Sequence, residues 1–217
     1  LSLHDALPYK NLYDGEIIDF SSNINPLGPP ARLKEYLSKS FDEVEKYPDI
    51  KYRILRENIG EYLNCEKENV VLGNGAVEII NNFIFLFKRV IIFSPAFSEY
   101  EKRAKIFNKD ILKLSFSKDY RLDIDAIKTS IKEGDILVLG NPNNPTGLRI
   151  EKQELLDIYE IVLDKKAFLL LDEAFFEFCP FDYDSIDIFK KYGYERVAII
   201  RAATNFFALP GIRFGYA

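Results

Sequence analysis

Hydrophobic and polar positions alternate along the chain in two rhythms. Short, mainly apolar runs predict strands at residues 70–72, 89–93, 111–116, 136–139, 167–171 and 197–200, after a separate short β run that starts at Ile17. Between them, apolar residues recur at helical spacing and predict helices at residues 31–41, 52–63, 76–87, 123–131 and 151–163. This alternation predicts an α/β fold, with a mostly parallel sheet sandwiched by helices.

Two strand ends carry sequences that interrupt regular structure. Residues 140–147 read Gly-Asn-Pro-Asn-Asn-Pro-Thr-Gly. The prolines and glycines force a turn at the carboxyl end of a strand, where ligands of open α/β sheets bind. Gly75 and Ala76 open the predicted helix 76–87, and free N–H groups at such a helix start suit a phosphate. Many strand-to-helix turns share that second pattern, so it is weak by itself.

A carboxylate follows the most apolar predicted strand. Residues 167–171 form a nearly continuous hydrophobic run, which is typical of a strand buried on both faces of a parallel sheet. Asp172 comes next, and a carboxylate at the end of a buried strand is costly unless it has a partner. A helix cap, a salt bridge or a bound ligand would each supply that partner.

Composition narrows the class of protein. The chain has 217 residues, 47% hydrophobic and 29% charged, with a net charge of −5, which is ordinary for a soluble protein and unlike a nucleic-acid binder. No apolar run reaches the roughly 20 residues that span a membrane. Cys65 and Cys179 have no paired spacing, which indicates a reducing cytoplasm. A single histidine, His4, excludes a histidine metal cluster and a Ser-His-Asp triad, so no metal is expected.

Residues 201–215 read Arg-Ala-Ala-Thr-Asn-Phe-Phe-Ala-Leu-Pro-Gly-Ile-Arg-Phe-Gly. This stretch resembles the cofactor-anchoring segment of fold type I pyridoxal-phosphate (PLP) enzymes, in the branch of threonine-phosphate decarboxylases and histidinol-phosphate aminotransferases. The Asn-Pro-x-Asn-Pro-Thr-Gly run is similar to a signature of class I and II aminotransferases. One position departs from the pattern: Asn205 stands where the family has its Schiff-base lysine. An amide cannot form an imine, so this chain as written lacks the group that attaches PLP in the family.

The resemblance implies a role for each matching residue. The catalytic positions would be Asn205 and Asp172, with Asp172 pairing with the pyridine nitrogen of PLP. Other cofactor contacts would come from Gly75, Ala76, Tyr100, Asn144, Thr204 and Arg213. Among these, backbone N–H groups and the arginine would hold the phosphate, Tyr100 would stack on the ring, and Asn144 would bond the phenolic oxygen. Tyr47 would reach the phosphate of a partner subunit, which implies a homodimer when the protein is full length.

The same resemblance leaves three functions open. Asn23, Ile24 and Asn25 would line the substrate entrance; their Asn-Ile-Asn-Pro-Leu-Gly context and Phe175 favour a threonine-phosphate decarboxylase of cobalamin biosynthesis. The alternative is a histidinol-phosphate aminotransferase of histidine biosynthesis. Either would act on a small phosphorylated amino acid or amino alcohol. The third possibility, favoured by Asn205, is a relative that binds PLP without turning it over, or an inactive fragment.

The resemblance also divides the chain. It runs from about residue 17 to residue 217. Residues 1–8 match nothing in the family and are interpreted as a non-native scar. Residues 9–50 would form an N-terminal arm with the substrate-entrance segment, and residues 51–217 an incomplete large PLP-binding domain. The family's C-terminal small domain is expected to be absent.

Overall fold

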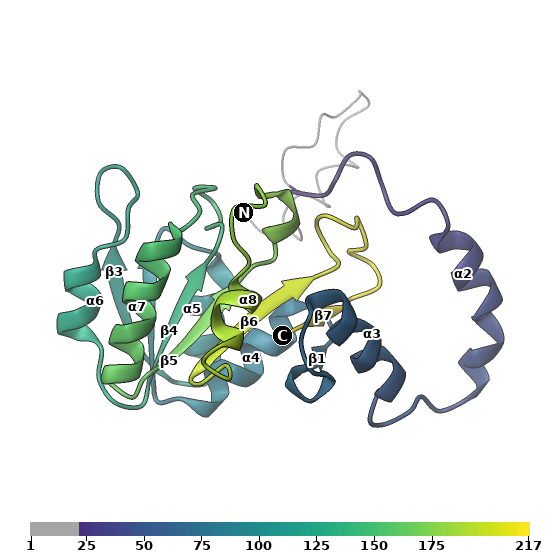
Figure 1. Cartoon of the computed structure of the whole chain (residues 1–217), viewed down its shortest axis with the longest axis horizontal. Coiled ribbons are helices and arrows are strands. Elements are labelled where there is room, and N and C mark those ends of the chain that lie inside the picture. Colours follow the sequence, from purple (N-terminus) through teal and green to yellow (C-terminus); the bar gives the residue numbers. More distant parts are fainter. Residues whose placement is uncertain (1–21) are drawn as a thin grey trace.

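A seven-stranded sheet forms the centre of the computed structural model, which describes residues 22–217 (Figure 1). The strand order is β1-β7-β6-β5-β4-β2-β3. The strands are β1 (Leu72–Gly73), β2 (Arg89–Ser94), β3 (Asp110–Ser115), β4 (Asp135–Gly140), β5 (Phe168–Asp172), β6 (Val197–Ala202) and β7 (Gly215–Tyr216). Only β7 runs antiparallel to its neighbours, so the predicted mostly parallel sheet is confirmed.

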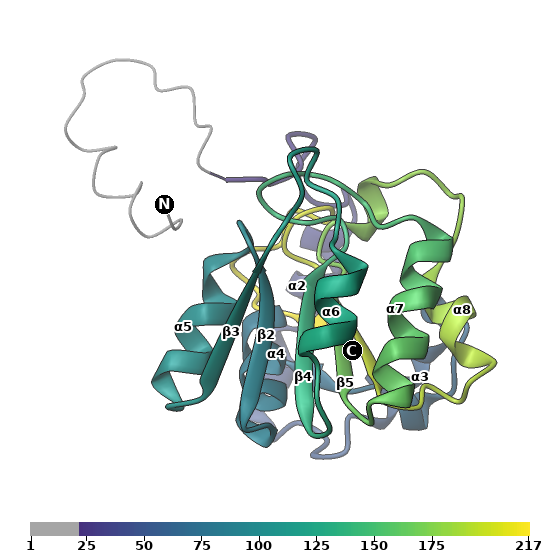
Figure 2. The ribbon, with the colours of Figure 1, turned by 90° about the vertical axis from the view of Figure 1, so that its left-hand side faces the viewer.

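Helices cover both faces of this sheet (Figure 2). One face carries α4 (Ala76–Leu86) and α5 (Ser98–Ile106). The other face carries α3 (Arg53–Leu63), α6 (Ile124–Ser130), α7 (Lys152–Asp164) and α8 (Ser185–Lys190). The predicted helices at 52–63, 76–87, 123–131 and 151–163 therefore agree with the structure to within one or two residues. The short helix α8 was not predicted, because its six residues span less than two turns.

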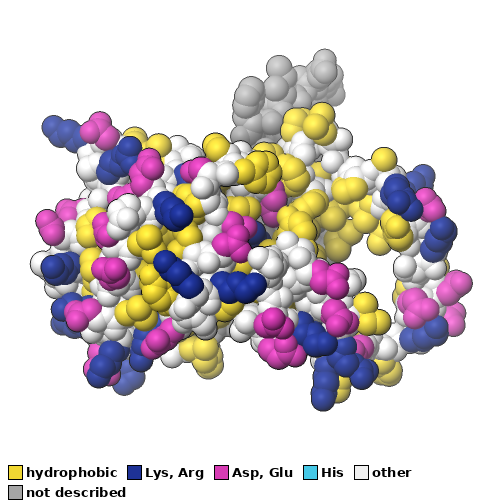
Figure 3. All heavy atoms as spheres, viewed as in Figure 1, with side chains coloured by type: hydrophobic (Ala, Val, Ile, Leu, Met, Phe, Trp, Pro, Cys, Tyr) yellow, Lys and Arg dark blue, Asp and Glu magenta, His cyan; other side chains and the backbone are white. Residues whose placement is uncertain are grey.

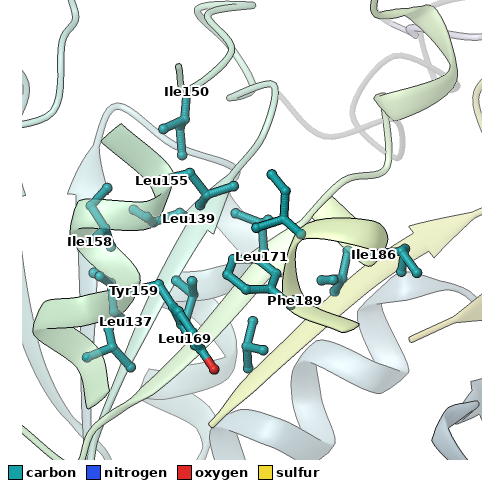
Figure 4. Packing of buried hydrophobic residues seen from close by; sticks show 14 of the residues in the cluster. Leu137, Leu139, Ile150, Leu155, Ile158, Tyr159, Leu169, Leu171, Ile186 and Phe189 are labelled. Carbon is teal, nitrogen blue, oxygen red and sulfur yellow. The ribbon is translucent and has the colours of Figure 1, made fainter. Parts of the chain in front are cut away.

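Alternating side chains of the central strands build the two halves of the core. In β4, Leu137 and Leu139 face one layer while Ile136 and Val138 face the other. Figure 4 shows the first layer, in which Leu155, Ile158 and Tyr159 of α7 pack against the strands. β4 and β5 are apolar on both faces and buried at all but one residue each, so they form a well-packed base for the residues that follow them.

An arm stands apart from this core (Figure 1). It contains α2 (Leu33–Lys39) and a short 3-10 helix (Phe41–Glu45), so the single helix predicted over 31–41 is shorter than expected. Neither helix buries any residue. Tyr36, Leu37, Phe41 and Val44 are exposed by half or more of their surface. In the space-filling view, charged side chains dominate the outer side of the arm, and apolar atoms show mainly along the side that faces the core (Figure 3).

Several predictions from the sequence are confirmed only in part or lie outside the described residues. The strand predicted at 70–72 appears as β1, although Val71 still exchanges backbone hydrogen bonds with Ala217. The short β run at Ile17 and the interpretation of residues 1–8 lie outside the described residues. The domain boundaries remain predictions. Among the described residues, no helix is long and apolar enough to cross a membrane.

Candidate functional site

The candidate residues gather where β4, β5 and β6 end. In the register of the sheet, Gly140 lies beside Asp172 and Asp172 lies beside Ile200. The backbone ladder continues one step further, because Asn141 N–H donates to the carbonyl of Asp172 at 2.8 Å. β4 and β5 therefore finish level with each other, and β6 continues beyond Ile200 to Ala202. The loops that leave them, which carry the predicted site residues, start from a common edge of the sheet.

The start of α4 forms an open cradle beside Arg213. Gly75 has φ +83°, a conformation that favours glycine, and a Cβ there would overlap the Arg213 guanidinium. A Cβ on Gly215 would lie 2.6 Å from the backbone N of Ala76. These contacts place a planar cation against the N–H groups of the first helical turn, and both features attract an anion. The Arg213 side chain is exposed, and its Nη1 donates one long bond, 3.3 Å, to the carbonyl of Pro210.

Asp172 is a buried acceptor in the same region. Its side chain belongs to a residue only 6% exposed. One carboxylate oxygen, Oδ2, accepts a hydrogen bond from the Tyr100 hydroxyl at 2.8 Å, and Oδ1 accepts one from the Ala174 N–H at 3.1 Å. Burial raises the pKa of Asp172, and these two donors act against that rise. Within the described part of the chain, no lysine or arginine forms a salt bridge with this carboxylate.

Two neighbouring asparagines in the loop 141–147 differ in their hydrogen bonds. Asn143 is buried and holds the loop, since its amide donates to the Pro95 carbonyl at 3.2 Å and to the Thr146 hydroxyl at 2.9 Å. Asn144 is half-buried, and no other described residue forms a hydrogen bond with its side chain. The loop geometry thus leaves the Asn144 amide without a hydrogen-bond partner among the described residues, and the cofactor contact that the resemblance implies for Asn144 stays a prediction.

The turn after β6 brings Asn205 next to the end of β5. Its side-chain amide donates to the carbonyl of Ala174 at 3.4 Å, two residues beyond Asp172. Thr204, immediately before it, is half-buried in the same turn. The amide of Asn205 is neither basic nor nucleophilic, so this position can donate hydrogen bonds but cannot form a covalent bond with an aldehyde.

The substrate-entrance segment reaches this turn through one residue. The backbone N–H of Asn25 donates to the carbonyl of Asn205 at 3.0 Å, and its side-chain amide donates to the carbonyl of Phe206 at 2.9 Å. Ile24 is half-buried beside it, while Asn23 is exposed. Asn25 therefore fastens the segment to the turn that carries position 205. Tyr47 lies on the arm and is fully exposed. Its contact with a partner subunit stays a prediction.

A buried ionic cluster supports the same three strand ends and was missed from the sequence. Glu173 is 0% exposed and accepts bonds from Arg201 Nη2 at 2.9 Å, Ser185 Oγ at 2.5 Å and Asn141 Nδ2 at 3.1 Å. Arg201 also bonds Asp184, with Nη2 to Oδ1 at 2.6 Å. The sequence did contain a signal, because a polar residue lies at the end of each of three apolar strands. These residues are Asn141 directly after β4, Glu173 directly after β5 and Arg201 within β6.

Burial alone would lower the pKa of Arg201, but the carboxylates of Glu173 and Asp184 outweigh burial and raise it, so the guanidinium stays charged. The guanidinium carbon of Arg201 also lies 3.5 Å from the centroid of the Phe176 ring, a cation–π contact. The cluster thus fixes the end of β5 on the side opposite to Asp172. Since successive residues of a strand point to opposite faces, the ionic contacts hold Asp172 without touching its side chain.

The fold and this edge of the sheet define a class of α/β enzymes that hold an anionic cofactor beside a buried carboxylate. Within that class the chain belongs to the aminotransferase class I and II family, whose sequence model matches residues 15–217. The fold class expected from the sequence, the large domain of fold type I, is therefore confirmed.

Particular relatives follow the branch expected from the sequence. The chain is 44% identical to the "Putative threonine-phosphate decarboxylase" of Caldanaerobacter subterraneus over 227 residues, covering 96% of this chain and 59% of the relative. It is 35% identical to the histidinol-phosphate aminotransferase of Methanococcus aeolicus, covering 95% and 56%. The crystal structure of the histidinol-phosphate aminotransferase from Clostridium acetobutylicum is similar with a TM-score of 0.84 and 38% identity, covering 92% and 60%. The chain thus spans about three-fifths of the length of these relatives.

Proposed function

We propose that this chain is the cofactor-binding portion of a threonine-phosphate decarboxylase-like protein and that it binds PLP without a covalent bond. One observation carries the proposal: the Arg213 guanidinium faces the N-terminus of α4 at the same sheet edge where Asp172 is buried with no cationic partner among the described residues. An anion fits the first feature, and a protonated ring nitrogen fits the second. A phosphorylated pyridine carries both groups in one molecule.

Each residue would then perform a defined task. The N–H groups of Gly75 and Ala76, with Arg213 and Thr204, would hold the phosphate. Asn144 would donate its free amide to the ring oxygen, and Asp172 would hold the proton on the ring nitrogen. PLP, when bound, supplies an acceptor for the electrons released at a substrate α-carbon. By keeping the ring nitrogen protonated, Asp172 would strengthen that acceptor.

Asn205 limits what the site can do. Lysine at this position would attach the cofactor and move protons at the substrate carbon, functions that contribute several orders of magnitude to rate. Asparagine performs neither. We infer that the chain as written holds PLP reversibly and has little or no turnover, although its family is one of enzymes.

The similar relatives and Phe175 favour one substrate class. The similarity to a named threonine-phosphate decarboxylase at 44% identity supports decarboxylation of threonine phosphate, while histidinol-phosphate aminotransferases at 35% keep transamination as the alternative. Phe175, in the loop after β5, lacks a hydroxyl that could bond the cofactor oxygen. Both substrates carry a phosphate, so both need a cationic pocket in addition to the cofactor cradle.

A second copy of the chain would complete the site. Tyr47 is 100% exposed and Phe41 and Val44 are each 73% exposed on an arm that buries none of its own residues. Such a surface is suited to packing on a partner. We propose that the full-length protein is a homodimer, located in the cytoplasm, in which Tyr47 of one subunit contacts the phosphate bound by the other.

Binding and covalent attachment can be tested separately. Equilibrium dialysis of the chain with PLP should show saturable binding that inorganic phosphate weakens. Borohydride reduction followed by mass spectrometry should find no pyridoxyl group within residues 197–217 of the parent chain, and one at position 205 of the Asn205→Lys variant. A pyridoxyl group fixed in that range of the parent, or no saturable binding, would overturn the proposal.

The reaction class needs a further assay. In the Asn205→Lys variant extended to full length, release of CO2 from threonine phosphate should exceed transamination of histidinol phosphate, in which 2-oxoglutarate accepts the amino group and becomes glutamate. Predominance of the transamination would reverse the ranking of the two activities. Absence of both in a folded protein that binds PLP would indicate that the site has changed at more than one position.

A further inference from the structure

Tyr100 contacts Asp172 through its hydroxyl rather than only facing the site with its ring. Tyr100 is 2% exposed and belongs to the first turn of α5, on the face of the sheet opposite to α7. Its hydroxyl oxygen lies 2.8 Å from Asp172 Oδ2. Burial, followed by the nearby Asp172 charge, raises the pKa of Tyr100 well above its ordinary value. The phenol therefore keeps its proton and is the donor in this bond.

The two hydrogen bonds on Asp172 fix its carboxylate from both sides. The Ala174 N–H holds Oδ1 and the Tyr100 hydroxyl holds Oδ2, so rotation about the last side-chain bond would break both. An ionised carboxylate has about four acceptor positions. Two of them are therefore still open, and a ring N–H can bind without displacing Tyr100.

We propose that Tyr100 is a positioning residue for Asp172: its hydroxyl orients the carboxylate and keeps it ionised, ready to accept a hydrogen bond from the protonated ring nitrogen of the cofactor. This inference rests on the proposed function. It assigns the hydroxyl a role separate from stacking of the Tyr100 ring, because a phenylalanine would stack equally well and could not donate.

Electrostatics explains why the hydroxyl is needed. Asp172 is buried, no described lysine or arginine forms a salt bridge with it, and burial disfavours its charged form. A hydroxyl that donates to a carboxylate forms a charge-assisted bond, which is roughly twice as strong as a bond between neutral groups. Without it, Asp172 would more often be protonated in the empty site, and a neutral acid attracts a ring cation far less.

The chain offers a matched control. Tyr159 of α7 is 1% exposed, and its hydroxyl donates to the Glu195 carbonyl at 2.7 Å. It lies in the helical layer on the other face of the sheet, away from Asp172. Tyr100→Phe and Tyr159→Phe each remove one buried hydroxyl and one hydrogen bond. A merely structural effect would appear in both variants, whereas a positioning effect would appear only in the first.

The first measurement uses two probes with parent, Tyr100→Phe and Tyr159→Phe chains. The Kd for PLP should rise roughly tenfold or more in Tyr100→Phe and stay unchanged in Tyr159→Phe. For 1-deaza-PLP, which lacks the ring nitrogen, the parent and Tyr100→Phe should have equal Kd values. An unchanged Kd for PLP in Tyr100→Phe, or an equal loss with both probes, would overturn the assignment.

The second measurement needs no cofactor. Carboxyl carbon NMR of the chain labelled at aspartate, with Asp172→Asn used to assign the signal, should show a higher pKa for Asp172 in Tyr100→Phe than in the parent. Identical titrations would refute the role of Tyr100. If the parent binds no PLP, the proposed function fails, and this titration still decides the proposal. Should Tyr100→Phe not fold, a fluorinated tyrosine at position 100, a stronger donor, must lower the pKa of Asp172.

Discussion

Removal of the Arg201 guanidinium is the most informative perturbation of the supporting cluster. In Arg201→Met, an apolar side chain of similar length replaces a group that is 3% exposed and bonds both Glu173 and Asp184. Glu173, at 0% exposure, would then be buried without a cation. Breaking a buried pair in this way costs about 3–5 kcal/mol in the free energy of unfolding, a large part of the roughly 5–15 kcal/mol that stabilises a typical protein.

The double variant shows whether the lost stability comes from an unpaired buried charge or simply from lost packing. Adding Glu173→Gln to Arg201→Met removes the uncompensated charge, while the glutamine oxygen can still accept from Ser185 and Asn141. The second substitution should therefore restore part of the lost stability. Urea unfolding should show lower midpoints for Arg201→Met with an unchanged slope, and a partial recovery in the double variant. Lys39→Met, which breaks an exposed pair with Glu35, is the control and should have little effect.

The pH dependence of unfolding provides a second test of the Arg201→Met variant. Burial is the main influence that raises the pKa of Glu173, and loss of Arg201 would raise it further. A raised pKa in the folded state means that the folded chain binds the proton more readily than the unfolded chain, so stability increases as the pH falls. The deficit of Arg201→Met should thus shrink between pH 7 and pH 5. A deficit that grows on acidification, or a double variant less stable than Arg201→Met, would refute the argument.

Three further outcomes follow from the geometry. Gly215→Ala, whose Cβ would lie 2.6 Å from the N of Ala76, should lower stability by about 1–3 kcal/mol and weaken PLP binding, as measured by urea unfolding and dialysis. Affinity for PLP should fall as the pH drops through the raised pKa of Asp172, because only the ionised carboxylate holds the ring proton. Without cofactor, the same raised pKa means that Asp172 contributes most to folding stability at low pH, as pH-dependent unfolding should show. The isolated chain should self-associate through the apolar arm, and light scattering should show less association for Phe41→Ser; a monodisperse parent with a cooperative melt would contradict this.

The sequence predicted the parts of the fold that depend on repetition. Runs such as 136–139 and 167–171 are apolar at every position, and the helix 151–163 repeats its apolar residues over three turns, so each has enough residues to define a period. Elements shorter than two turns or three strand residues, such as α8 and β7, contain too few positions to show one. The antiparallel direction of β7 depends on its pairing with β1 and β6, which no local pattern encodes.

The site was predictable only where resemblance supplied roles. The apolar run 167–171 alone made Asp172 a buried carboxylate with an unspecified partner, and the structure supplies Tyr100, which is 72 residues away in the chain. The same limit applies to the ionic cluster, in which Arg201 and Glu173 are 28 residues apart; Arg201 lies in β6, and Glu173 directly follows the adjacent strand β5. Pairings across such separations are set by strand order and register, so they follow from the assembled sheet rather than from any one segment.

Little of the described structure depends on the side chain at position 205. The Asn205 side chain makes one long contact, 3.4 Å to the carbonyl of Ala174. By contrast, its backbone carbonyl accepts the N–H of Asn25, a bond that any residue at this position could form. Asp172 is held by Tyr100 and Ala174, and Arg213 is placed by the glycine-rich contacts around α4, all independently of that side chain. A change from lysine to asparagine would therefore remove the chemistry of the site while leaving its architecture intact. This independence is why binding and covalent attachment are expected to separate cleanly in this chain.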